Sequence, residues 1–335
     1  MSRIAVMGSG AWGTALAISL ARRGGHSIAL WSYAKDVAAT MREQRENTAF
    51  LPGFQIPESV EIFEGAGETL AGAAIVVSVT PSQFVRSSYA QFAPHLRAGQ
   101  MLVSATKGIE DETCLRMSEV IAEVLAERGL SLPIGVLSGP SFAQEVAAGA
   151  PTAITIASAD APLAARVQRE FSSGTLRLYT NDDVVGVELG GSLKNVIAIA
   201  AGIVAGLELG FNSNAALITR GIAEITRLAV ACGGRRETLA GLSGMGDLVL
   251  TCTGSLSRNR TVGMGLGQGR ELGDVLAGLE GRVAEGVRTT SAALGLARRH
   301  GVEMPIAEQM EAILMHGKPP ERAIEELMQR PGRDE

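Results

Sequence analysis

Lys194 is the residue of this sequence whose type and setting most clearly suggest chemistry. The pattern from Asp183 to Glu208 predicts one long helix, because apolar residues recur at steps of three and four. A second face of that helix holds glycines and alanines, with Lys194 as its one large, charged member. Burying an unpaired ammonium is costly, so this lysine must find a partner or lose its proton. A salt-bridged or snorkelling lysine is the simpler interpretation.

Lysine is rare in the whole chain. Of 30 basic side chains, 26 are arginine and four are lysine, namely Lys35, Lys107, Lys194 and Lys318. A mutational bias toward arginine would produce this ratio, but it would first remove the lysines that arginine can replace. Arginine keeps its proton, whereas burial can tune a lysine to act as a base. The lysines that remain are therefore candidates for positions where arginine cannot serve.

A glycine-rich polar stretch in the second half of the chain supplies further candidates. It contains Asp247, a candidate partner for the ammonium of Lys194. Ser257, Arg258 and Asn259 then offer a hydroxyl, a guanidinium and an amide within three residues. A phosphate group suits several donors and a planar bidentate cation, so this set is a candidate phosphate site. A helix N-cap followed by a surface arginine is the alternative.

The start of the sequence carries a glycine pattern of another kind. Gly8-Ser9-Gly10-Ala11-Trp12-Gly13 stands between a strand pattern at Ser2–Met7 and a helical pattern, and a second strand pattern covers His26–Trp31. In such a βαβ unit the glycines permit a tight turn and let the backbone approach a pyrophosphate at the helix N-terminus. The sequence therefore predicts a dinucleotide-binding turn here.

The residues after the second strand bear on which dinucleotide is bound. An acidic residue usually stands there and holds the ribose 2'-hydroxyl, but this chain has Ser32-Tyr33-Ala34-Lys35. Without a carboxylate to repel a 2'-phosphate, NADP is permitted as well as NAD. Ser32 and Lys35 are candidates to bind the extra phosphate, although Lys35 is equally suited to a solvated helix surface.

The order of the patterns predicts the fold class. Strand patterns alternate with helical patterns up to Thr180, and only helical patterns follow. We expect an α/β fold, with a Rossmann-type domain and mainly parallel sheet at 1–181 and an all-helical domain at 182–335. Ligands of open α/β sheets bind at the carboxyl ends of strands. Lys107 and the Gly139-Pro140-Ser141 turn both follow predicted strands.

Composition excludes several classes of protein. The chain is 46% hydrophobic and 19% charged, and its net charge of -5 without a basic tract argues against nucleic acid as a partner. The longest apolar run, Val196 to Leu207, predicts no membrane span. Three cysteines lack the spacing of metal ligands or of a disulfide framework, so we expect no metal site and a reducing cytoplasm.

Taken in order, these motifs resemble the bacterial type of NAD(P)-dependent glycerol-3-phosphate dehydrogenase. The stretches that carry the resemblance span both predicted domains: GSGAWGTALA from Gly8, SATKGIE from Ser104, GPSFAQEV from Gly139, GGSLKNVIAIAAG from Gly190, GLSGMGDLVLTCTGSLSRNR from Gly241 and VAEGVRTT from Val283. The resemblance implies a homodimer that interconverts sn-glycerol 3-phosphate and dihydroxyacetone phosphate in the cytoplasm and feeds phospholipid synthesis.

The resemblance also implies roles for individual residues. Lys194 is expected to be the proton acceptor, with Lys107 and Asp247 able to orient and polarise the reacting groups. The expected substrate contacts are Lys107, Gly139, Ser141, Lys194, Asn195, Asp247, Ser257, Arg258 and Asn259. The expected cofactor contacts are Gly8, Ser9, Gly10, Ala11, Trp12, Gly13, Ser32, Tyr33, Lys107, Ala143, Arg258, Val283 and Glu285. The family often carries arginine or histidine after the second strand, so Ser32 and Tyr33 depart from its pattern.

Two alternatives remain open at this point. A lysine-dependent β-hydroxyacid or ketopantoate-type dehydrogenase would have a similar two-domain fold, but it would need a grip on a carboxylate. A dinucleotide-binding sensor without chemistry would have no reason to retain Lys107, Lys194 and Asp247. Oxidation of NADPH with dihydroxyacetone phosphate, present or absent, separates the three functions.

Overall fold

The structure is a computed structural model that describes residues 2–279 and 283–332. The chain divides into two compact units. The sheet unit comprises Met1–Lys107 and Leu115–Glu188, and the helical unit comprises Gly108–Cys114 and Leu189–Glu335. The two units meet between Glu188 and Leu189, inside a helix, whereas the sequence placed the domain boundary after residue 181. That predicted boundary stays a prediction.

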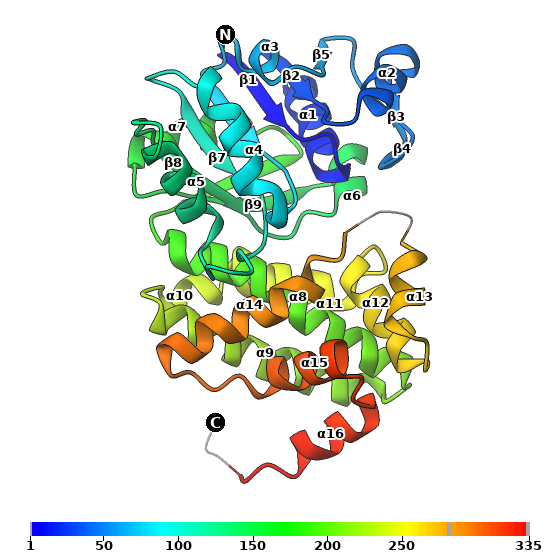
Figure 1. Cartoon of the computed structure of the whole chain (residues 1–335). Coiled ribbons are helices and arrows are strands. Elements are labelled where there is room, and N and C mark those ends of the chain that lie inside the picture. The colour runs from blue at the N-terminus through cyan, green and yellow to red at the C-terminus, as the bar shows by residue number, and fades with distance from the viewer. Residues whose placement is uncertain (1, 280–282, 333–335) are drawn as a thin grey trace. The chain divides into compact units, whose positions relative to one another are not determined.

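The sheet unit is built on eight strands in the order β10-β9-β8-β7-β6-β1-β2-β5 (Figure 1). Neighbouring strands are parallel except β8 and β9, which are antiparallel. From β1 the chain first builds the sheet toward β2 and β5, and then returns to the other side of β1 with β6. A ligand site is therefore expected outside the carboxyl ends of β1 and β6, where the strand order reverses.

The elements of the sheet unit have the following bounds. Its strands are β1 (Ser2–Met7), β2 (His26–Trp31), β5 (Val60–Phe63), β6 (Ile75–Ser78), β7 (Met101–Ser104), β8 (Ile134–Ser138), β9 (Thr152–Ala157) and β10 (Leu176–Asn181). Its helices are α1 (Ala11–Arg23), α2 (Lys35–Gln44), α3 (Ala66–Leu70), α4 (Val85–Phe92), α5 (Met117–Ala126), α6 (Ala143–Ala148) and α7 (Ala161–Phe171). Two short turns of 3-10 helix lie at Ser82–Phe84 and Ala93–His95, and β3 (Glu46–Asn47) pairs with β4 (Leu51–Gln55) in a small hairpin.

Both faces of the sheet are buried. In β1, Ile4 and Val6 belong to one core cluster, whereas Ala5 and Met7 belong to a second, because successive side chains of a strand point to opposite faces. The first cluster includes residues of α1, α6 and α7, and the second includes residues of α3, α4 and α5. This double cover explains why the central strands read as continuous apolar runs.

The helical unit contains no strand in its described part, as the sequence predicted. Its elements are α8 (Val184–Gly206, which begins in the sheet unit), α9 (Gly210–Ala231), α10 (Arg236–Leu239), a π-helical turn (Leu242–Gly246), α11 (Asp247–Thr253), α12 (Arg258–Gly267), α13 (Leu272–Ala277), α14 (Glu285–His300), α15 (Pro305–His316) and α16 (Pro320–Met328).

Helix α8 is the long helix that the apolar periodicity predicts. Its first turn is capped by Asp183, whose carboxylate accepts the N–H of Gly186 at 2.8 Å. Among the described residues, α8 alone is long and apolar enough to cross a membrane by length and composition. The prediction of no membrane span rests on Val196 to Leu207 alone and stays a prediction, because that run covers only part of this helix. Its apolar window is 89% buried, as in a core helix.

Helix α8 contacts α12 backbone to backbone. A Cβ atom on Gly202 would lie 2.1 Å from the carbonyl oxygen of Arg260, and one on Gly263 would lie 1.8 Å from that of Ile199. Gly206 and Gly267 repeat the contact one turn further along. Because no side chain separates the two helices at these points, the backbones themselves fix the distance between them.

Most sequence predictions about the fold are confirmed. The two strands predicted at Ser2–Met7 and His26–Trp31 occur with those bounds as β1 and β2. Strand β5, the β3–β4 hairpin, α11 and α16 were not predicted. The four residues of β5 and the glycine-rich lead into α11 are too short or too polar to give a clear period.

Candidate active site

The predicted dinucleotide turn joins β1 to α1 at the point where the strand order reverses. Gly8 has φ of 136°, and a Cβ there would lie 2.7 Å from the carbonyl oxygen of Val79, just after β6. A Cβ on Gly13 would lie 1.9 Å from the carbonyl oxygen of Gly8. A Cβ on Gly10 would meet nothing within 4 Å. The outer glycines therefore close the turn, and the middle one leaves its backbone open to an anion at the start of α1.

The end of β2 is arranged differently from the prediction for Ser32. The hydroxyl of Ser9 donates to the hydroxyl of Ser32 at 2.8 Å, and Ser32 donates to the carbonyl of Ala34 at 3.0 Å. Ser32 is fully buried, whereas Tyr33 is 82% exposed and Lys35 is exposed. Ser32 thus connects the glycine turn to β2 from within, while Tyr33 and Lys35 face solvent.

Asn47 supports the same turn and was missed by the sequence analysis. Its side-chain amide donates to the carbonyl of Ser9 at 2.7 Å and to the hydroxyl of Thr14 at 2.8 Å. The residue is 1% exposed and comes from the β3–β4 hairpin. No local pattern marks Asn47, because its partners lie more than thirty residues away in the sequence.

The predicted residues at the ends of β7 and β8 lie together in the sheet unit. The Nζ atom of Lys107 donates to the carbonyl of Gly139 at 3.0 Å, and the hydroxyl of Ser141 donates to the same oxygen at 3.0 Å. Gly139 has φ of 134°, and a Cβ there would lie 3.0 Å from the Cα of Ile154. Since β7 and β8 are parallel neighbours, their carboxyl ends share one edge, as the prediction required. Ala143 follows as the first residue of α6, and it packs on the same core cluster as Trp12.

The structure confirms the predicted pairing of Lys194 with Asp247. The Nζ atom of Lys194 lies 2.8 Å from Oδ1 of Asp247. The exposed fraction is 6% for Lys194 and 1% for Asp247, so both charges are removed from bulk water. A buried pair is tolerated only with close geometry and additional hydrogen bonds. Of the simpler interpretation, a salt-bridged or snorkelling lysine, the salt-bridged form is therefore confirmed, and the snorkelling form is wrong because Lys194 is buried.

Thr251 supplies one such additional bond and was missed by the sequence analysis. Its hydroxyl accepts a hydrogen bond from Nζ of Lys194 at 2.6 Å and donates to the main-chain carbonyl of Asp247 at 2.6 Å. Asp247 and Thr251 lie one turn apart on α11 and so share a face. The sequence offered one signal for Thr251, because it follows the candidate acid Asp247 by four residues and so lies on the same face of a helix.

The π-helical turn places α11 against α8. A Cβ on Gly190 would lie 2.7 Å from the carbonyl oxygen of Ser243, so this turn rests on the backbone of α8 one turn before Lys194. Gly190 belongs to the face of α8 that holds glycines and alanines, and the absence of a side chain there lets the turn approach closely. Cys252 also lies in this region, and burial raises the pKa of its thiol to about 12. At neutral pH this cysteine is therefore protonated and is no nucleophile.

A third arrangement of the helical unit links α8, α12 and α14. The side-chain amide of Asn259 donates to Oδ1 of Asn195 at 3.0 Å, and its oxygen accepts the N–H of Gly286 at 3.0 Å. Ser257 caps α12 by accepting the N–H of Arg260 at 3.2 Å, and Arg258 is exposed at the start of that helix. The N-cap alternative is thus correct for Ser257. Val283 and Glu285, at the start of α14, are half-buried.

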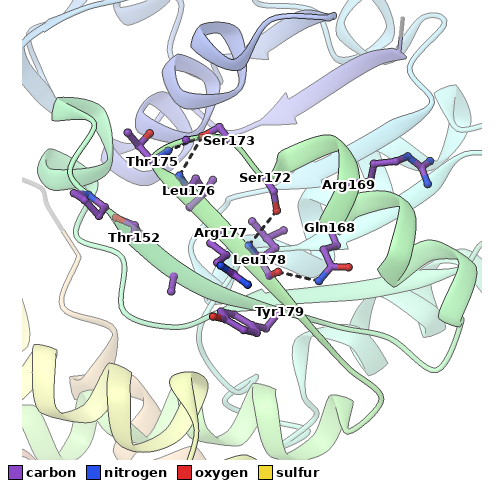
Figure 2. A pocket seen from close by; sticks show the side chains of 13 residues that line it. Thr152, Gln168, Arg169, Ser172, Ser173, Thr175, Leu176, Arg177, Leu178 and Tyr179 are labelled. Atoms are coloured by element: carbon purple, nitrogen blue, oxygen red, sulfur yellow. Dashed lines mark hydrogen bonds between the residues drawn. The ribbon is translucent and has the colours of Figure 1, made fainter.

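A cavity of about 720 Å³, whose lining includes none of these residues, lies beside the edge strand β10 (Figure 2). Gln168 donates to the carbonyl of Leu178 at 2.9 Å, and the Ser172 and Ser173 hydroxyls accept the N–H groups of Leu178 and Leu176. These side chains satisfy backbone groups on the open edge of the sheet, which would otherwise be able to pair with another chain. We interpret this cavity as part of an edge-protecting structure.

Among residues 2–279 and 283–332, no group of three or more His, Cys, Asp or Glu side chains could hold a metal ion.

Comparison with known proteins gives one consistent result. Two family models match, the NAD-dependent glycerol-3-phosphate dehydrogenase N-terminus at residues 3–164 and its C-terminus at residues 183–325. The chain is 64% identical to the glycerol-3-phosphate dehydrogenase [NAD(P)+] of Acidobacterium capsulatum and 62% identical to that of Koribacter versatilis, over at least 99% of each protein. The solved structure of the Coxiella burnetii glycerol-3-phosphate dehydrogenase is 40% identical, covers 98% of this chain and 99% of its own, and has a TM-score of 0.94.

Replacement of Thr251 by valine tests the energetic role of the hydroxyl at Lys194. Thr251→Val removes an acceptor from a buried ammonium, so the free energy of unfolding should fall by about 1.5–3 kcal/mol in urea denaturation at neutral pH. Thr253→Val is the matched control, because Thr253 makes the same intrahelical bond, to the carbonyl of Val249 at 2.8 Å, but is exposed. Equal losses in the two variants would show that the hydroxyl of Thr251 does nothing for Lys194.

Proposed function

This chain belongs to the family of NAD-dependent glycerol-3-phosphate dehydrogenases, and we propose that it interconverts sn-glycerol 3-phosphate and dihydroxyacetone phosphate with NADP or NAD. The structural observation that carries the proposal is the buried Lys194–Asp247 pair, which provides a positioned proton donor and acceptor. The carboxylate-binding dehydrogenase and the sensor without chemistry are not favoured, because both halves of the chain match this one family.

The cofactor is proposed to bind at the glycine turn. The open backbone at Gly10 and the uncapped start of α1 fit the pyrophosphate of a dinucleotide. When bound, the nicotinamide supplies the hydride in reduction and receives it in oxidation. The remaining proposed cofactor contacts are Ser9, Ala11, Trp12, Tyr33, Lys107, Ala143, Arg258, Val283 and Glu285. Because no carboxylate follows β2, we expect NADPH to serve at least as well as NADH.

Lys194 is proposed to transfer the proton. In reduction, its ammonium donates a proton to the carbonyl oxygen of dihydroxyacetone phosphate as hydride reaches the carbonyl carbon, which gives the alcohol of glycerol 3-phosphate. In oxidation, the neutral amine takes the hydroxyl proton. The carboxylate of Asp247 at 2.8 Å favours the ammonium form, which is the form that reduction requires. Asp247 and Thr251 also fix the direction of Nζ through their hydrogen bonds.

The phosphate of the substrate is proposed to bind at the start of α12. Arg258 is exposed there and offers a planar fork of donors, and the helix N-terminus adds a favourable dipole. Ser257 and Asn259 flank it with groups already engaged in hydrogen bonds to the protein. Lys107, Gly139 and Ser141 of the sheet unit, with Asn195 of α8, complete the proposed set of substrate contacts.

The wider biology is proposed from the family resemblance. Glycerol 3-phosphate made by this reaction would supply phospholipid synthesis in the cytoplasm, and the enzyme would act as a homodimer without a nucleic-acid or membrane partner. The net charge of -5 and the burial of α8 are consistent with this proposal.

Replacement of Lys194 by arginine tests the proton-transfer proposal. Lys194→Arg keeps a positive charge but removes a group that can lose its proton at neutral pH, so kcat should fall by about 10²–10⁴-fold. Binding of NADPH, measured by fluorescence titration, should change little. Lys318→Arg is the control, because Lys318 pairs with Glu326 outside the proposed site. If Lys194→Arg keeps a tenth of the normal kcat, the proton-transfer proposal is wrong and Lys194 has only an electrostatic or structural role.

Replacement of Arg258 tests the proposed phosphate site through the ratio of kcat/KM for dihydroxyacetone phosphate to kcat/KM for dihydroxyacetone. A charged hydrogen-bonded contact is worth about 1.5–3 kcal/mol, or roughly ten- to a hundredfold in binding. Arg258→Ala should therefore lower kcat/KM for dihydroxyacetone phosphate by that factor and leave the value for dihydroxyacetone nearly unchanged. Arg258→Lys should restore part of the preference, because a point charge replaces a planar fork.

The Arg258 assays require saturating cofactor, since Arg258 is also a proposed cofactor contact. The matched control is Arg270→Ala, which removes an exposed arginine that follows the end of the same helix. If Arg258→Ala lowers kcat/KM equally for the phosphorylated and unphosphorylated substrates, the phosphate site lies elsewhere.

A further inference from the structure

The first turn of α14 rests directly on the backbone of α8. A Cβ atom built on Gly286 would lie 2.5 Å from the carbonyl oxygen of Asn195 and 2.8 Å from its carbonyl carbon. Real Cβ atoms essentially never approach another atom within 3.0 Å, so any side chain at this position would force a displacement. The obstructing atoms belong to the backbone in the middle of α8 and cannot rotate away as a side-chain end can.

The same contact is held from the side by Asn259. Its side-chain oxygen accepts the N–H of Gly286 at 3.0 Å, which satisfies one of the donors that a helix N-terminus leaves without an intrahelical partner. Its amide donates to Oδ1 of Asn195 at 3.0 Å. Asn195, Asn259 and Gly286 are all buried, so one buried junction joins three helices.

Two residues that adjoin this junction along the chain, Lys194 and Glu285, have proposed roles in the reaction. Asn195 directly follows Lys194 on α8, and Gly286 directly follows Glu285 on α14. A contact between the backbones of Asn195 and Gly286 therefore fixes how far Glu285 lies from Lys194. Helices can also pack through side chains at larger separation, so the absence of a side chain at Gly286 is what permits this close approach.

We propose that Gly286 is a positioning residue that sets Glu285 relative to Lys194, with Asn259 as the clamp that holds the contact. The inference rests on the proposed function, in which Glu285 contacts the cofactor and Lys194 transfers the proton. Gly286 itself touches neither ligand. Because Gly286 has no side chain, the first turn of α14 can contact the backbone of α8.

The expected size of the effect follows from the geometry. Restoring an ordinary carbon–oxygen contact of about 3.4 Å at Gly286 would move the first turn of α14 by roughly 1 Å. A misplacement of about 1 Å in an active site can cost about 10²-fold in rate. Gly286→Ala should therefore weaken NADPH binding by tenfold or more and also lower kcat at saturating NADPH and dihydroxyacetone phosphate.

Gly273→Ala provides a matched control for the substitution. Gly273 is the second residue of α13, as Gly286 is the second residue of α14, and neither has a positive φ. A Cβ on Gly273 would meet nothing within 4 Å. Both substitutions change helix propensity in the same way. Gly273→Ala should leave the dissociation constant of NADPH within twofold of the wild-type value.

The deciding experiment removes the group that Gly286 is inferred to position. The dissociation constant of NADPH is measured by fluorescence titration for wild type, Glu285→Ala, Gly286→Ala and the double variant. We expect each single substitution to weaken binding and the double variant to bind within about threefold of Glu285→Ala, because the displaced carboxylate is already gone. A double variant in which the two losses multiply overturns the inference, as does unchanged NADPH binding in either single variant.

Two measurements keep the test decisive. If Gly286→Ala does not fold, Asn259→Ala takes its place, since it removes the acceptor of the Gly286 N–H. It should weaken NADPH binding in the wild-type background and have no further effect in the Glu285→Ala background. Oxidation of NADPH by wild-type enzyme with dihydroxyacetone phosphate tests the proposed function separately. Where that activity is present and the losses multiply, only the positioning role fails.

Discussion

A lysine ammonium and an aspartate carboxylate lie 2.8 Å apart in the helical unit, where each is almost fully removed from water. Moving either charge out of water costs several kcal/mol, and their attraction offsets that cost only when the geometry is close and further hydrogen bonds are made. The Lys194–Asp247 pair therefore constrains its surroundings. Thr251 must lie one turn after Asp247, and α11 must approach α8 closely enough for its side chains to reach Nζ.

Glycine makes these approaches possible around α8. Gly190 admits the π-helical turn before α11, Gly202 and Gly206 admit α12, and Gly286 admits α14. A contact between backbones has no rotamers to rearrange, so it fixes a separation more firmly than a contact between side chains. One buried helix thus carries Lys194 and also contacts, backbone to backbone, the elements that lead into or contain Asp247, Arg258 and Glu285. The distances between the helices around Lys194 therefore depend on glycines, which have no side chain.

The sequence predicted the parts of this arrangement that depend on local order. The Gly8–Gly13 turn, the length of α8 and the pairing of Lys194 with Asp247 follow from spacing, periodicity and the cost of an unpaired charge. Asn47 and the contact of Gly286 with Asn195 were out of reach, because each depends on residues more than thirty positions apart. Ser32 was offered as a phosphate ligand from its place after β2, but packing turned its hydroxyl inward to Ser9.

The central claim is that Lys194 exchanges the proton of the reaction, and its titration tests this most directly. The chain has four lysines, so lysine labelled with ¹³C at Cε gives a spectrum of four signals, and Lys194→Arg identifies one of them. The account predicts that the Lys194 signal titrates with the same midpoint as kcat/KM for oxidation of glycerol 3-phosphate, which reports groups of the free enzyme. A Lys194 signal that stays in the ammonium form across the pH range where activity rises would contradict the account.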